Sequence, residues 1–161
     1  MMHYVGLGLL FLGCALLCTQ FSAYQQKRLL EYEGLLRLLK HMRSEVMLYL
    51  RPFPECVLDF KNEALQKTGF LDALKDYKTP ADAWEATHQN FSINGELCKE
   101  FYTFCKNFGK GYAENECKLL ESYIEKFEKS MENERKEAPR TAKLVRTLIA
   151  SGGCAVAVLL L

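Results

Sequence analysis

The sequence predicts an all-α fold, in which a cytosolic bundle of about five to six helices is flanked by one transmembrane helix at each end. Every Asp, Glu, Lys and Arg lies in the middle of the 161-residue chain, because residues 1–26 and 147–161 carry none. Within this middle, apolar residues recur at steps of three and four, which is the spacing of one helix face. No segment alternates with the period of two that is typical of a half-buried strand.

The first apolar run, Tyr4–Tyr24, is long enough to cross a hydrocarbon core, which takes roughly 20 helical residues. We therefore expect residues 1–26 to form a transmembrane helix. A secretory signal peptide is the alternative, but no basic segment precedes the run and Phe21 disturbs the small-residue pattern before Ala23. A lipobox-like sequence that ends at Cys14 also leaves lipidation open.

The last apolar run predicts a second transmembrane helix over residues 144–161, with the long side chain of Arg146 reaching the headgroups. Gly152 and Gly153 belong to a patch of small residues in this run. In lipid, such a patch lets two helix backbones approach closely, so we expect both glycines to pack against another helix. A terminal helix without a partner is the alternative.

The basic residues next to the two runs predict the orientation of the chain. They are Lys27, Arg28, Arg37, Lys40 and Arg43 after the first run, and Lys129, Arg135, Lys136, Arg140, Lys143 and Arg146 around the start of the second. Because Lys and Arg resist translocation, we expect residues 27–143 to form a cytosolic domain of a cell-membrane protein in contact with the lipid bilayer. The net charge of +1 gives no basic face for nucleic acid.

The sequence contains no catalytic signature, so we expect no enzymatic activity, no catalytic residues, no metal and no cofactor. Gly109-Lys110-Gly111 lacks the spacing of a phosphate-binding loop. The three histidines have no metal-type partner, and His41 and His88 are expected at polar surface positions. The acids Glu114, Glu116 and Glu121 resemble a solvated helix face. The seven cysteines form no C-x-x-C pair and are expected to act as free thiols, those of the middle as small core residues.

Start and stop signals divide the middle into helices. A stripe of apolar residues predicts a helix over residues 27–50, which the proline-rich segment 51–54 should end. A second helix is expected from Glu55 to Thr68.

Two later helices have strong amino-terminal signals, namely Thr79-Pro80 and Asn94-Gly95. Trp84, the only tryptophan, is expected to be a core residue. Gly109–Gly111 should end the helix that begins at Asn94-Gly95, and a long final helix should follow. Pro139 should kink or interrupt that final helix.

Several short motifs, in their order, resemble those of the stage III sporulation protein AB family over nearly the whole chain. They are Leu38-Leu39-x-x-x-Arg43-x-Glu45-Val46-x-x-Tyr49, Pro52-Phe53-Pro54-Glu55, Trp84, Phe108-Gly109-Lys110-Gly111, and Gly152-Gly153 in an apolar tail. The family's pattern after the glycine turn has an acidic cap and then a glutamine, where this chain has Tyr112 and Glu116.

The resemblance implies a mother-cell protein of endospore-forming bacteria, in the membrane that engulfs the forespore. It implies a non-enzymatic platform in a secretion-like channel, with a soluble domain similar to the F-domain of the type II secretion platform protein. The implied partners are a secretion-type ATPase (stage III sporulation protein AA) and other membrane subunits of the channel, and a homo-oligomer is left open.

We expect partner docking at six residues, which are Arg43, Glu45, Pro52, Pro54, Glu55 and Lys110. Each has a structural alternative, because the prolines shape a turn in any case and Arg43 with Glu45 can tie helices together. Other interpretations stay open: a platform F-type protein of another secretion or pilus system, an exported helical module with a processed amino terminus, or a redox or metal protein built on Cys98, Cys105 and Cys117.

Overall fold

The structure, a computed structural model, describes the backbone of residues 2–49 and 53–160 and the side chains of residues 6, 12–48, 55–149 and 151–152. Within these residues all regular structure is helical, which confirms the all-α class. The elements are α1 (Met2–Tyr49), α2 (Phe53–Leu58), α3 (Glu63–Lys67), α4 (Phe70–Asp76), α5 (Pro80–Thr87), a 3-10 turn η1 (His88–Asn90), α6 (Gly95–Asn107) and α7 (Ala113–Leu160).

The chain forms two compact units, each of which takes part of α1 and part of α7. One unit consists of residues 27–132, and the other consists of residues 1–26 with residues 133–161. We call the first the bundle and the second the terminal hairpin.

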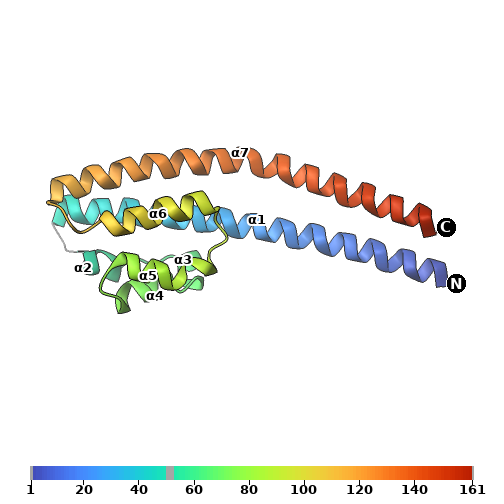
Figure 1. The fold of residues 1–161 in the computed structure, drawn as a ribbon, viewed down its shortest axis with the longest axis horizontal. Helices are drawn as coiled ribbons and strands as arrows, with labels where there is room; N and C mark the ends of the chain where they lie inside the picture. Colours follow the sequence, from blue (N-terminus) through green and yellow to red (C-terminus); the bar gives the residue numbers. More distant parts are fainter. Residues whose placement is uncertain (1, 50–52, 161) are drawn as a thin grey trace. The chain divides into compact units, whose positions relative to one another are not determined.

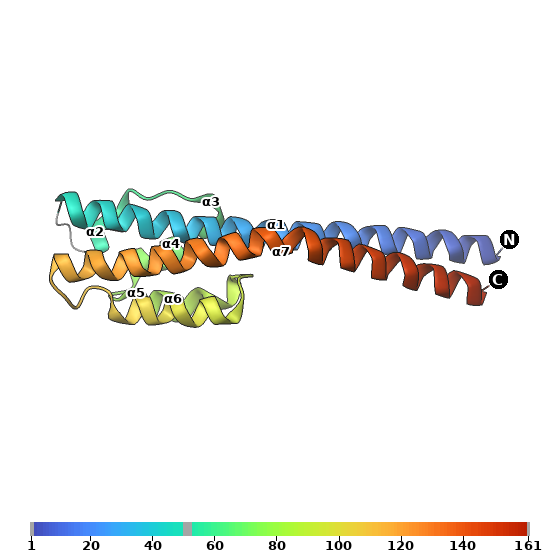
Figure 2. The same cartoon turned by 90° about the horizontal axis from the view of Figure 1, so that it is seen from above.

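The bundle is built around three helical segments that run side by side, namely the second part of α1, α6 and the first part of α7 (Figures 1 and 2). The short helices α2–α5 lie along α1 and α6, on the side away from α7 (Figure 1). The predicted apolar stripe of α1 faces the core, because Tyr32, Leu35, Leu39, Met42 and Val46 are all buried.

An aromatic cluster joins four of the helices. The ring centroid of Phe101 on α6 lies 4.6 Å from that of Trp84 on α5 and 5.7 Å from that of Phe70 on α4. Phe127 on α7 completes the cluster at 5.8 Å from Phe101. Trp84 is buried, which confirms the prediction that it is a core residue.

Side-chain caps begin α5 and α6 where the sequence predicts them. The Thr79 side chain accepts a hydrogen bond from the Asp82 amide, and that of Asn94 accepts one from the Leu97 amide. The predicted single helix over residues 55–68 is wrong, because α2 ends at Leu58 and α3 begins at Glu63. The physical reason is a third cap, since the Asn62 side chain accepts a hydrogen bond from the Leu65 amide and starts a new helix.

A kink or an interruption was predicted at Pro139. The long helix α7 continues through this residue, so the interruption is wrong. Proline lacks an amide N–H, which removes one hydrogen bond, but the remaining bonds on both sides still hold the helix.

In the terminal hairpin, the first part of α1 lies beside the last part of α7. The Arg146 guanidinium donates to the Ser22 hydroxyl at 3.4 Å, and the Cys14 sulfur lies 4.0 Å from the Ile149 carbonyl oxygen. Each helix therefore contributes polar groups to contacts within this unit.

Among the described residues, no helix combines the length and the apolar character that crossing a membrane requires. This finding contradicts the predicted transmembrane helices over residues 1–26 and 144–161, and the membrane localisation that depended on them. The described apolar residues of α1 are followed closely by Thr19, Gln20 and Ser22, and those of α7 are interrupted by Arg146 and Ser151, so polar groups limit both runs.

Candidate docking site

The turn between α6 and α7, Gly109–Gly111, is held by hydrogen bonds to a side chain of α7 and is called the Lys110 turn below. Gly109 has a φ of +85°, a left-handed conformation that glycine adopts without steric cost. The Glu116 carboxylate accepts hydrogen bonds from the Gly109 amide at 3.1 Å and from the Gly111 amide at 2.7 Å. A break at this position was predicted, and the structure confirms it.

Glu116 is only 7% exposed, so its predicted place on a solvated helix face is wrong. The side chain bends back from the first turns of α7 to reach two amides of the turn. An ideal Cβ built on Gly111 would lie 3.1 Å from the Glu116 carboxylate oxygen, so this close approach favours glycine there.

The turn presents one charged and one aromatic side chain to solvent. Lys110 is exposed, and no hydrogen bond or ion pair joins its ammonium group to another residue that the structure describes. Tyr112, directly after the turn, is 85% exposed.

Arg43, by contrast, is engaged within the bundle. Its guanidinium donates to one carboxylate oxygen of Glu121 on α7, with N···O distances of 3.1 and 2.5 Å. One turn earlier on α1, the Lys40 ammonium lies 2.6 Å from the Glu128 carboxylate, so two ion pairs join α1 to α7. Glu45 lies half-buried on α1 in the same bundle.

Two of the remaining predicted docking residues, Pro54 and Glu55, belong to α2. Glu55 is exposed in the first turn of α2, where the helix dipole favours a negative charge. Pro54 lies in the same helix, although its side chain is outside the described residues, and Pro52 lies outside them altogether.

The structure brings several of these residues to one end of the bundle. The carboxyl end of α1, helix α2 and the Lys110 turn meet at this end (Figures 1 and 2). These elements also carry large apolar side chains that are exposed, namely Met47, Leu48, Leu58 and Tyr112.

Gly152, in the terminal hairpin, is exposed with nothing within 4 Å of an added Cβ, and the surroundings of Gly153 lie outside the described residues.

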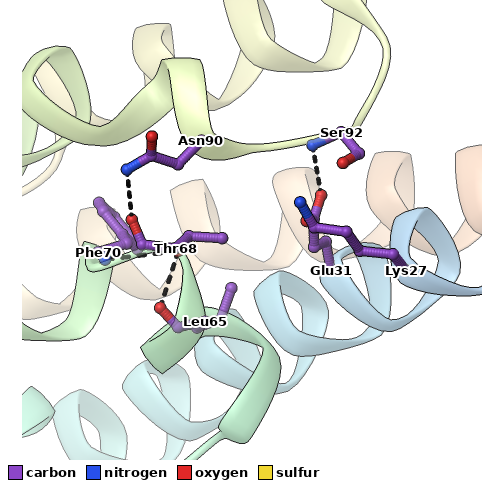
Figure 3. Close-up of polar contacts among 7 residues, drawn as sticks. All are labelled: Lys27, Glu31, Leu65, Thr68, Phe70, Asn90 and Ser92. Atoms are coloured by element: carbon purple, nitrogen blue, oxygen red, sulfur yellow. Dashed lines mark hydrogen bonds and ion pairs between the residues drawn. The ribbon is translucent and has the colours of Figure 1, made fainter. Parts of the chain in front are cut away.

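Sequence reasoning missed Glu31, the most deeply buried acid among the described residues. Its side chain is 1% exposed, and its carboxylate accepts a hydrogen bond from the Ser92 amide at 2.5 Å (Figure 3). Lys27 lies one turn away on α1, with its ammonium 3.6 Å from the carboxylate. Burial raises the pKa of Glu31, while the Ser92 amide and Lys27 lower it in part. The spacing from Glu31 to the buried residues Leu35 and Leu38 is helical and could have placed it on the core face.

A second polar contact lies nearby and holds the corner between α3 and α4. The Thr68 hydroxyl donates to the Leu65 carbonyl at 2.8 Å, and the Asn90 side chain donates to the Thr68 carbonyl at 2.9 Å (Figure 3). The loop after α5 is therefore joined to α1 by Glu31 and to the α3–α4 corner by Thr68.

Histidines and cysteines give no further site within the described residues. His41 is half-buried with its ring centroid 5.3 Å from that of Phe60, so its predicted surface position is wrong, while His88 is exposed. Cys105 is buried, which raises the pKa of its thiol and keeps it neutral. No group of three or more His, Cys, Asp or Glu side chains in this part of the chain is placed to hold a metal ion.

Comparison with known families assigns nearly the whole chain to one family. The family model described as stage III sporulation protein AB matches residues 3–161. The chain belongs to the stage III sporulation protein AB family, which is a sporulation-associated family. No curated protein and no solved structure matches the chain significantly, so the likeness to the type II secretion F-domain stays a prediction.

Proposed function

We propose that this member of the stage III sporulation protein AB family is a non-enzymatic docking component of a sporulation assembly. Its partner in this proposal is the secretion-type ATPase, stage III sporulation protein AA, which the family resemblance implies. The observation that carries the proposal is the Lys110 turn. Its hydrogen-bonded backbone presents an ammonium group that has no partner among the described residues, beside an exposed tyrosine.

The internal hydrogen bonds of the turn support a docking role, because binding through a loop whose conformation is already held loses less conformational entropy than binding through a loose one. Glu116 provides this order through its two hydrogen bonds to the turn. Because the Lys110 ammonium pairs with no residue in the described part of the chain, it can pair with a partner's carboxylate, and tyrosine is enriched at protein interfaces. Exposed Met47, Leu48 and Leu58 add apolar surface at the same end of the bundle.

The other predicted docking residues take different parts in this proposal. Glu55 offers a second exposed charge, of opposite sign to Lys110, and Pro54 shapes the start of its helix. Arg43 acts indirectly, because its ion pair with Glu121 joins the helices α1 and α7 whose ends carry the docking surface. Further subunits of the assembly would bind at other surfaces.

The proposal is tested by measuring the affinity of the purified full chain for the purified ATPase, by biolayer interferometry. Lys110→Glu should weaken binding by about tenfold or more, because it places a repelling charge at the centre of the contact. Lys78→Glu, between α4 and α5, is the matched control, with the same change of charge at an exposed position that has no ion pair within the described residues, and it should change the affinity little.

Binding of the wild-type chain should also weaken as the salt concentration rises, because the contact with Lys110 is electrostatic. Equal affinities for the wild-type chain and Lys110→Glu would overturn the docking role of the turn. A wild-type chain that does not bind the ATPase at all would overturn the proposed partner.

A further inference from the structure

A pocket in the bundle, distinct from the Lys110 turn, lies between α5 and α6. It has a volume of about 250 Å³, its surface is largely apolar, and its lining residues are Trp84, Glu85, His88, Cys98, Lys99 and Tyr102. Trp84 is buried and Cys98 is half-buried, so both belong to the inner wall of the pocket. We call this the Trp84 pocket.

The size of the pocket indicates what it can hold. Sites for small molecules usually measure about 300–1,000 Å³, so this pocket is small for such a ligand and suits a single apolar side chain. Full burial of a leucine-sized side chain is strongly favourable in water, so a protein segment that inserts one would gain affinity there.

The charges at the rim of the pocket are not equivalent. Glu85 already accepts a hydrogen bond from the Tyr102 hydroxyl, and the Lys106 ammonium lies 4.6 Å from the centre of the Tyr102 ring. Lys99, in contrast, forms no hydrogen bond or ion pair through its ammonium group with any residue that the structure describes. Glu85 keeps its negative charge, because the tyrosine that donates to it is neutral. Lys99 is therefore the rim cation that is available to a partner, and its ammonium group complements a carboxylate.

We propose that the Trp84 pocket is a second docking site, which receives an apolar side chain from a protein partner whose neighbouring acidic residue pairs with Lys99. This site does not depend on the proposed binding of the ATPase at the Lys110 turn. Lys99 lies eight residues before the end of α6, or about 12 Å along the helix, so the two sites occupy different parts of the bundle.

The only tryptophan of the chain lines this pocket, so its fluorescence reports on occupancy without a label. We would titrate the full chain with the dipeptide acetyl-Leu-Glu-amide and follow the Trp84 emission. Acetyl-Leu-Gln-amide and acetyl-Ala-Glu-amide are the matched probes, which lack the charge and the larger apolar side chain respectively.

A saturable change in emission is expected with acetyl-Leu-Glu-amide, with a dissociation constant on the order of millimolar for so small a probe. The glutamine probe should bind roughly two- to fivefold more weakly, which is the range of one exposed ion pair. The alanine probe should bind about tenfold more weakly or worse, because it buries less apolar surface.

Two variants show whether the named residues are responsible. Lys99→Ala, a surface change that should leave the fold intact, should remove the preference for the glutamate probe over the glutamine probe. Lys126→Ala, on α7 and outside the lining of the pocket, should keep that preference. The proposal is overturned if no probe gives a saturable change, if all three bind equally, or if Lys99→Ala retains the preference.

Discussion

Glu31 and Glu116 are carboxylates that the bundle buries in order to bind backbone amides of loops. Glu116 binds two amides of the Lys110 turn within seven residues of chain, whereas Glu31 binds the Ser92 amide from 61 residues away. A loop amide that is partly shielded from water needs an acceptor, and an ionised carboxylate is a strong one. Helical periodicity shows that an acid lies on a given face, but not that a distant loop brings an amide to it, so sequence reasoning placed Glu116 in solvent.

Replacement of Glu116 by alanine should destabilise the bundle by about 1–3 kcal/mol, because two amides of the turn lose their acceptor. Glu116→Gln should cost less, since its amide oxygen can still accept from one of the two. Urea denaturation of the full chain measures both, as a change in midpoint at constant slope. Glu114→Ala, at an exposed position in the same helix turn, is the control and should have a much smaller effect. Equal effects of the Glu114 and Glu116 variants would refute this role.

Glu31 should give the stability of the bundle a defined pH dependence. Burial raises its pKa above the ordinary value of 4.5, so the folded state holds this proton more tightly than the unfolded state does. By linkage, its contribution to stability is fully present below pH 4.5 and is lost as the pH rises through the raised pKa. Glu31→Gln cannot titrate but keeps an oxygen for the Ser92 amide.

The test for Glu31 is the difference in the free energy of unfolding between the wild-type chain and Glu31→Gln, measured from pH 4 to pH 8. The free energy of unfolding of the wild-type chain, relative to that of Glu31→Gln, should be highest at low pH. It should fall as the pH rises. A difference that stays constant, or that favours the wild-type chain more at higher pH, would show that burial does not control the titration of Glu31.

At the scale of helices, the sequence signals that correctly predicted helix starts and ends are local. Thr79 and Asn94 cap the first turns of α5 and α6 with their own side chains, and Gly109 ends α6 through a backbone conformation that glycine favours. The prediction failed over residues 55–68, where the Asn62 cap was overlooked within an otherwise helical pattern. Short helices such as α2 and α3 depend on tertiary packing, which a local pattern does not reveal.

Pro139 should cost α7 stability, because the helix continues through it. Its ring crowds the Arg135 carbonyl, which also loses its hydrogen-bond donor. Pro139→Ala should therefore raise the free energy of unfolding of the terminal hairpin by roughly 1–3 kcal/mol, seen as a higher melting temperature by circular dichroism at 222 nm. Ala138→Gly, at the neighbouring position, should change the melting temperature in the opposite direction. An unchanged or lower melting temperature for Pro139→Ala would contradict a helix that is continuous at this residue.

For the whole molecule, the all-α class followed from periodicity, and the family followed from the order of several short motifs. The prediction of transmembrane helices failed at this scale. The apolar runs are long, but polar residues such as Gln20 and Arg146 lower their apolar character. The Trp84 pocket was also beyond sequence reasoning, since it depends on how α5 and α6 meet. The docking residues could be proposed from motifs, but which of them are engaged, as Arg43 is, required the structure.

The central claim is that the Lys110 turn binds the secretion-type ATPase. Hydrogen–deuterium exchange of the full chain, measured with and without the ATPase, tests this claim most directly. We predict that peptides covering residues 106–116 gain protection in the complex, and that this gain disappears with Lys110→Glu. Protection confined to other parts of the chain, with unchanged exchange at the turn, would contradict the account.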